Sequence, residues 1–199
     1  ASREMVALCG VLLLGYTTFS FAAQSRADQR LREELRSIGV EPLRGRVTAS
    51  PFNTLVWRGI YETEDSYWIG YWAVTDSDED LPFSKVPRRV DLLEPHRGER
   101  AIDCALWFSE EFLLVEPKED GISFLVTDLR FVEFWPPENN GLPKTFFAWK
   151  VAPAKGDDPA IFEPSRVRRP EVSNLFRALG ERLQGDRDAL LPYPYRPSS

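Results

Sequence analysis

The chain has 199 residues, of which 43% are hydrophobic, and its 6 Trp, 13 Phe and 6 Tyr exclude a disordered polypeptide. Each buried aromatic side chain removes about 150–250 Å² of surface from water, so these residues can fill the core of one domain. The formal net charge is -6, with acids and bases interspersed, which argues against nucleic acid as a partner because phosphate backbones are bound by clustered positive charge.

An uncharged run extends from Met5 to Ala23. As a helix rising about 1.5 Å per residue, this run reaches about 28 Å, close to the thickness of the hydrocarbon layer of a bilayer. It predicts a transmembrane helix over residues 1–24, with the lipid bilayer as a partner. The alternatives are a buried helix and a cleaved signal peptide, but a signal peptide would begin with Met and a basic segment.

Several small or hydroxylated residues dilute this run, and such residues pack against neighbouring membrane helices. They are Gly10, Gly15, Thr17, Thr18 and Ser20. Together with the start at Ala1, they predict a fragment whose upstream membrane helices are further partners.

The segment 25–40 has helical spacing of Leu31, Leu35 and Ile38 and ends at Gly39, so we expect a solvent-exposed continuation of the anchor helix. Its arginines favour a cytoplasmic position for the following domain by the positive-inside rule. They are Arg26, Arg30, Arg32 and Arg36.

Residues 41–185 change to β-branched and aromatic patterns and predict a soluble domain. A hairpin is expected at 54–61 and 67–74, an acidic turn at 76–80, and an extended passage through Arg88, Val90 and Leu92. A short helix is expected at 98–108, and strands at 112–116, 121–127, 129–135 and 145–151. A helix at 171–183 follows, and the Pro-rich tail 186–199 is expected to be extended or disordered.

These elements predict an α+β fold, in which an N-terminal transmembrane helix precedes a mostly antiparallel sheet with two helices packed on one face.

Chemical motifs in the sequence are few. The single histidine, His96, lies in an expected loop beside Pro95, and a common zinc or iron site needs several converging ligands. The run from Asp76 to Asp80 resembles the opening of a calcium loop but has Pro87 where the bidentate Glu belongs, so a solvated turn is favoured over a weak cation site. No catalytic residue, and no cofactor in this chain, is predicted.

Two segments place charge inside apolar strands. Arg58 follows Trp57 and therefore lies on the opposite strand face, while Asp128 and Arg130 share a face. Two interpretations are open: an internal ion-pair network that fixes strand register, or a polar ligand pocket lined by the three charged residues and Asn53.

The order of several motifs resembles the C-terminal half of the YdjM-like bacterial inner-membrane proteins, which are named as membrane-bound metal-dependent hydrolases. The motifs are Ser50-Pro51-Phe52-Asn53, Trp57-Arg58, Tyr67-Trp68-Ile69-Gly70-Tyr71, Trp107-Phe108-Ser109 and Asp128-Leu129-Arg130-Phe131. The resemblance covers roughly residues 43–151, and the preceding apolar helix matches the last membrane span of that family.

This resemblance implies an inner (cytoplasmic) membrane location and a soluble accessory domain of a metal-dependent hydrolase. The metal ligands would belong to missing upstream helices, so a divalent metal is expected only there and no catalytic residue carries over to this chain. The residues alone leave a second function open, that of a non-enzymatic membrane-tethered binding or scaffold module. Binding of anionic lipid headgroups by the four arginines is a third, weakened by the interleaved acids.

Overall fold

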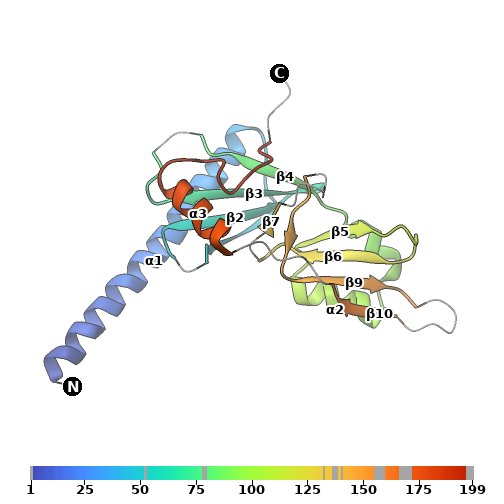
Figure 1. The fold of residues 1–199 in the computed structure, drawn as a ribbon, viewed down its shortest axis with the longest axis horizontal. Helices are drawn as coiled ribbons and strands as arrows, with labels where there is room; N and C mark the ends of the chain where they lie inside the picture. Colours follow the sequence, from blue (N-terminus) through green and yellow to red (C-terminus); the bar gives the residue numbers. More distant parts are fainter. Residues whose placement is uncertain are drawn as a thin grey trace.

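The computed structural model describes residues 2–195, except 52, 78–79, 132, 136–138, 140, 155–159 and 166–171. It confirms the α+β class, with a long apolar N-terminal helix and antiparallel sheets (Figure 1). The helices among the described residues are α1 (Arg3–Ser37), the 3-10 helix η1 (Val90–His96), α2 (Arg100–Ser109) and α3 (Val172–Leu183). The helices expected at 98–108 and 171–183 are therefore present as α2 and α3.

In place of one sheet, the described residues form two four-stranded sheets and a short two-stranded one. The first is a meander of β1 (Arg44–Ala49), β2 (Val56–Glu62), β3 (Ser66–Ala73) and β4 (Phe83–Pro87). The second has the order β10 (Ile161–Pro164), β9 (Ala148–Ala152), β6 (Phe124–Asp128) and β5 (Leu113–Pro117), and β7 (Glu133–Phe134) pairs with β8 (Lys144–Thr145). The hairpin expected between residues 54 and 74 is confirmed as β2 and β3.

The long helix α1 begins and ends with regular caps. The Ser2 hydroxyl accepts a hydrogen bond from the backbone N–H of Met5 at 3.3 Å. At the other end Gly39 has φ +77°, and the N–H of Val40 bonds to the Leu35 carbonyl at 2.9 Å, which is the bond pattern of a Schellman motif. The predicted helix end at Gly39 is confirmed.

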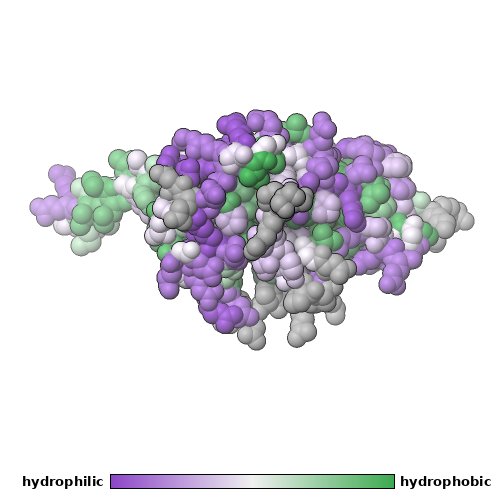
Figure 2. Space-filling view, turned by 90° about the horizontal axis from the view of Figure 1, so that it is seen from above, coloured by the Kyte–Doolittle hydropathy of each residue, from purple (hydrophilic) through white to green (hydrophobic). Residues whose placement is uncertain are grey.

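The N-terminal part of α1 projects away from the body of the protein (Figure 1). Its most apolar 18-residue window has a mean hydropathy of 1.8, and none of that window is buried. Large apolar side chains are exposed on every side of this segment, among them the consecutive Val11, Leu12, Leu13 and Leu14. Figure 2 shows apolar residues along the projecting helix and a mainly hydrophilic surface on the body. By length and composition, this helix is able to cross a membrane.

The C-terminal part of α1 packs against the first sheet, which corrects the expectation of a solvent-exposed continuation. Ala23, Ala27, Leu31 and Leu35 recur every fourth residue and are buried. They form a core with the sheet face that carries Trp57, Tyr61, Trp68 and Trp72. The juxtamembrane segment is therefore part of the folded domain.

The opposite face of the first sheet packs against α3 and the start of the second sheet. In Figure 1, α3 lies in front of this sheet and α1 behind it. The two helices expected on one face of a single sheet instead pack on different sheets, α3 on the first and α2 on the second. The first sheet also needs α1 on its other face, because its strands are apolar on both faces. A third cluster joins η1 and α2 to the second sheet.

Two other expected elements differ. The passage through Val90 and Leu92 forms η1 instead of extended chain, with Val90 and Leu93 buried under the second sheet. Of the strand expected over 129–135, residues 129–130 form a turn instead. Only Glu133–Phe134 is a strand, namely β7. In the tail, Leu191 is buried and the Tyr195 ring packs edge-on against Trp68 at 4.8 Å, while 196–199 lie outside the described residues.

Candidate functional site

Asn53 is a turn residue in the loop between β1 and β2. Its side-chain Oδ1 accepts hydrogen bonds from the backbone N–H groups of Leu55 and Val56, at 3.0 and 2.8 Å. Its Nδ2 donates to the carbonyl of Pro51 at 3.1 Å. These bonds close a local turn of the kind that Asn side chains commonly support, so Asn53 shapes the entry into β2.

Asp128 and Arg130 pair with each other at the end of β6. The Arg130 Nη2 and the Asp128 Oδ2 lie 2.7 Å apart, and the Asp128 carboxylate also accepts the backbone N–H of Arg130 at 3.0 Å. The hydrogen bonds that Arg130 donates to Asp128, and then the charge of Asp128 and the contact with Glu110, raise the pKa of Arg130 against the lowering effect of burial. Arg130 Nη1 continues the network to Glu110 at 2.9 Å, and Glu110 contacts Arg46 of β1 at 3.2 Å.

Arg58 is buried on the face of β2 opposite Trp57, as its place in the strand predicts. Its Nε donates to Glu133 Oε2 at 2.5 Å, and its Nη2 donates to the carbonyl of Leu129 at 2.9 Å. The Tyr71 hydroxyl donates to the other oxygen of Glu133 at 2.9 Å. Arg58, Asp128 and Arg130 are thus held in ion pairs, as the network interpretation expects.

Burial and neighbouring charges determine the protonation states of Arg58 and Tyr71. Burial alone would lower the pKa of Arg58, but Glu133 and Tyr71 raise it, so the guanidinium stays charged. Burial, and then the negative charge of Glu133, raise the pKa of Tyr71 well above its usual range, so its hydroxyl remains a donor. The charges of Arg58 and Glu133 therefore cancel.

Above Glu133 lies a pocket of 330 Å³, bounded by α3, β7 and the C-terminal segment. That volume is at the lower end of the range of small-molecule sites. Its walls are mostly aromatic and aliphatic: Phe134, Trp135, Phe146, Leu175, Ala178, Ala189, Leu190 and Pro192. None of Asn53, Arg58, Asp128 and Arg130 lines this pocket; Arg58 contributes by holding Glu133 from below.

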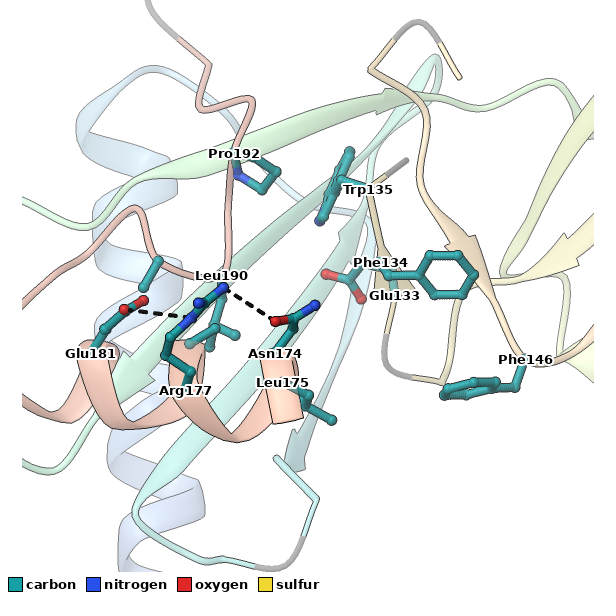
Figure 3. A pocket seen from close by; sticks show the side chains of 12 residues that line it. Glu133, Phe134, Trp135, Phe146, Asn174, Leu175, Arg177, Glu181, Leu190 and Pro192 are labelled. Carbon is teal, nitrogen blue, oxygen red and sulfur yellow. Dashed lines mark hydrogen bonds and ion pairs between the residues drawn. The ribbon is translucent and has the colours of Figure 1, made fainter. Parts of the chain in front are cut away.

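The polar groups of the pocket lie at its centre and at its edge (Figure 3). The indole nitrogen of Trp135 points toward the middle of the pocket, as does the amide nitrogen of Asn174, with the Glu133 carboxylate behind them. Trp135 Nε1 is buried and has no hydrogen-bond partner among the described residues. At the edge, Arg177 donates to Asn174 Oδ1 at 3.2 Å and contacts Glu181 at 3.9 Å.

The helical wall of the pocket is attached to the first sheet by a second buried ion pair. Arg182 of α3 donates to both oxygens of Asp76, at 2.6 and 2.5 Å, and to the carbonyl of Tyr71 at 3.0 Å. The sequence predicted a solvated turn here, but the Asp76 side chain is only 3% exposed and is therefore buried. Residues 78–79 of that turn lie outside the described residues.

Sequence reasoning missed Glu133 and Trp135. The signal was available, because Glu133 stands between Val132 and Phe134 in an apolar segment, as Arg58 does in its own strand. A charge in such a place needs a partner of opposite sign. Among the described residues, no group of three or more His, Cys, Asp or Glu side chains is placed to hold a metal ion.

Comparisons with protein-family models, with curated proteins and with solved structures found no match to this chain.

Proposed function

We propose that the chain is a membrane-tethered, non-enzymatic binding module. One observation carries the proposal: α1 is a single uninterrupted helix whose first half is exposed and apolar on all sides, and whose second half is part of the domain core. A soluble protein seldom leaves so large a contiguous apolar surface in water.

The polar groups of the apolar half also suit lipid. The hydroxyl of Thr17 donates to the carbonyl of Leu13 at 2.8 Å, four residues earlier, and just beyond the run the hydroxyl of Ser25 donates to the carbonyl of Phe21 at 2.9 Å. Hydroxyls bonded within their own helix do not need water. The segment can therefore leave water without leaving these two donors unpaired.

The domain begins where the apolar run ends. Ala23 is the first buried residue of α1, and the next residue, Gln24, donates from Nε2 to the carbonyl of Val47 in β1 at 2.9 Å. No linker separates the apolar half of the helix from the sheet. The first sheet, and the folded domain with it, is therefore held close to the bilayer surface.

We further propose the inner (cytoplasmic) membrane and a cytoplasmic domain, on the basis of the four arginines that follow the apolar run. Ion pairs with acids include Arg30 with Glu33 at 3.5 Å, Arg32 with Asp28 at 3.0 Å, and Arg36 with Glu41 at 3.4 Å. These acids do not cancel the topological preference, because Asp and Glu contribute little to it. The same pairing argues against a strong site for anionic headgroups.

The two cysteines test this arrangement. Cys9 lies in the apolar half of α1 and Cys104 on α2, and both thiols are free and exposed. Variants with Cys9→Ala or Cys104→Ala each leave one thiol. With a membrane-impermeant maleimide, Cys104 should react in inverted vesicles and not in spheroplasts, and Cys9 should react only after detergent is added. Fast labelling of Cys9 in intact vesicles, or a chain shortened near residue 23, would contradict the proposal.

A second candidate is an accessory domain beside a membrane-embedded, metal-dependent hydrolase. Besides the family resemblance, it is favoured by Gly10 and Gly15, because the surface of α1 is open where their side chains would be, and such small residues could admit a closely packed membrane helix. The test is the upstream coding sequence: membrane helices rich in His, Asp and Glu would support this role, and their absence would remove it.

A further inference from the structure

The pocket above Glu133 has the construction of a ligand site. Its volume of 330 Å³ is large enough for several water molecules, so it holds either solvent or a ligand in solution. Its walls are largely apolar, and water inside such walls is readily displaced by an apolar group. The two buried ion pairs below and beside it, Arg58 with Glu133 and Arg182 with Asp76, fix its floor and its helical wall.

The charges around the pocket select against an ionic ligand. Arg58 neutralises Glu133 at the floor, and Arg177 lies beside Glu181 at the edge. A charged molecule that enters this pocket loses its hydration. Each of these four side chains already has a partner of opposite charge, so none of them compensates the ligand for that loss. An uncharged ligand avoids this cost.

The central polar groups select against a pure hydrocarbon. A hydrocarbon would leave the buried N–H of Trp135 without a partner, whereas a carbonyl oxygen could accept it. Asn174 offers a second N–H that points the same way, and the Glu133 carboxylate lies behind both (Figure 3). Each oxygen of Glu133 has one protein partner and can accept another hydrogen bond, so an N–H next to the carbonyl of the ligand would also be satisfied.

We propose that this pocket binds a small, uncharged, apolar amide, with its carbonyl oxygen on Trp135 Nε1–H and its apolar group among the aromatic walls. The inference rests on the proposed function, since it names the ligand class of the binding module. It requires no catalytic activity.

The test uses three compounds of similar size and the full chain in nanodiscs. Phenylacetamide is the uncharged amide, phenylacetate is its charged analogue, and propylbenzene lacks the carbonyl. We would titrate each and follow the ¹⁵N-indole N–H signals of the six tryptophans, with Trp135→Phe identifying the signal of Trp135. Phenylacetamide should shift that signal and bind at least about tenfold more tightly than either other compound.

The variants complete the test. Trp135→Phe keeps an aromatic wall but removes the donor, and should weaken phenylacetamide about tenfold while leaving propylbenzene unchanged. Trp107→Phe is the matched control, because Trp107 is 80% exposed and does not line this pocket, and it should bind like the parent. Equal binding of the three compounds, an unmoved Trp135 signal, or no binding at millimolar phenylacetamide would overturn the inference. Cysteine labelling is independent of these titrations, so failure here would leave the membrane tether standing.

Discussion

Gly59 on β2 and Gly70 on β3 are register partners, and Leu31 of α1 lies over both of them. A Cβ added to Gly59 would lie 2.6 Å from Tyr61 Cε2 and 2.7 Å from Leu31 Cδ1, and one added to Gly70 would lie 2.6 Å from Phe83 Cε1 and 3.1 Å from Leu31 Cδ2. The absence of side chains at this pair therefore leaves room both for Leu31 of the helix and for the two aromatic rings of the sheet. Larger residues would separate the anchor helix from the domain.

Substitution of Gly59 by Ala is expected to lower the free energy of unfolding by about 1–3 kcal/mol, the usual cost of overpacking a core. Urea denaturation in mild detergent, followed by tryptophan fluorescence, would measure it. Gly180→Ala on α3 is the control, because nothing lies within 4 Å of its added Cβ, and it should leave stability unchanged or raise it. If Leu31→Ala did not relieve part of the Gly59→Ala defect, steric contact with Leu31 would not be the cause.

Removal of one partner of the Arg58 and Glu133 pair should be costly. The side chains are 1% and 0% exposed, so Arg58→Ala would leave a buried carboxylate without its cation, at a cost of about 3–5 kcal/mol. The double variant Arg58→Met with Glu133→Leu should recover much of this loss. Arg46→Ala breaks an exposed pair, with side chains 43% and 55% exposed, and its effect should be within experimental error. Equal losses for Arg58→Ala and Arg46→Ala would refute the buried-pair account.

The bond between Arg182 and Asp76 should control the docking of α3. Arg182→Met removes both hydrogen bonds to the Asp76 carboxylate and leaves that buried charge unpaired, so we expect faster amide hydrogen exchange throughout α3. Phenylacetamide binding should weaken in parallel, because α3 forms one wall of the pocket. Arg177→Ala on the same helix, where the side chain is 70% exposed, should leave exchange unchanged. Protection of α3 that survived in Arg182→Met would count against this role.

Glu116 should make stability depend on pH. Its pKa is raised above the usual 4.5, first by burial, against the smaller opposing effects of Lys144, Lys118 and Arg89. A raised carboxyl pKa contributes stability that is present below the unfolded pKa and is lost as the pH rises through the folded pKa. Glu116→Gln should therefore be more stable than the parent at pH 7, with the difference shrinking as the pH falls toward 4.5.

Thermal unfolding at several pH values would measure this effect, with Glu64→Gln as the control because Glu64 is exposed in the β2–β3 turn. If the stability gained by Glu116→Gln increased as the pH fell, burial of the Glu116 carboxylate could not be its cause.

Elements with a local signal could be predicted from the sequence. The apolar run, the helix end at Gly39, and the alternation that places Trp57 and Arg58 on opposite faces depend only on spacing and residue type. The helix α3 has a strong apolar stripe and was also found. These features follow from periods of 3.6 and 2 residues, which are visible without tertiary contacts.

Features that depend on distant partners could not be found in the same way. Ala23 and Ala27 continue the buried stripe of Leu31 and Leu35, but alanines carry a weak hydrophobic signal, and so this face seemed exposed. The turn at 129–130 breaks an apolar run because the side chain of Asp128 binds the backbone and guanidinium of Arg130. The tail is held by Trp68 and by the carbonyl of Phe83, which lie more than one hundred residues earlier.

The pocket was missed for a related reason. Its residues come from β7 and Trp135, from Phe146 just after β8, from α3 and from the C-terminal segment, and no spacing in the sequence joins these parts. Arg58 was recognised as a buried charge, but its partner lies 75 residues away.

The continuity of α1 has a mechanical consequence for the domain. From Tyr16 to Ile38 the helix contains neither glycine nor proline, so it has no obvious point at which to bend. If the apolar half lies in a bilayer, its tilt is transmitted directly to the first sheet. A change in bilayer thickness, or a neighbouring helix that alters this tilt, would then rotate the mouth of the pocket toward or away from the lipid headgroups.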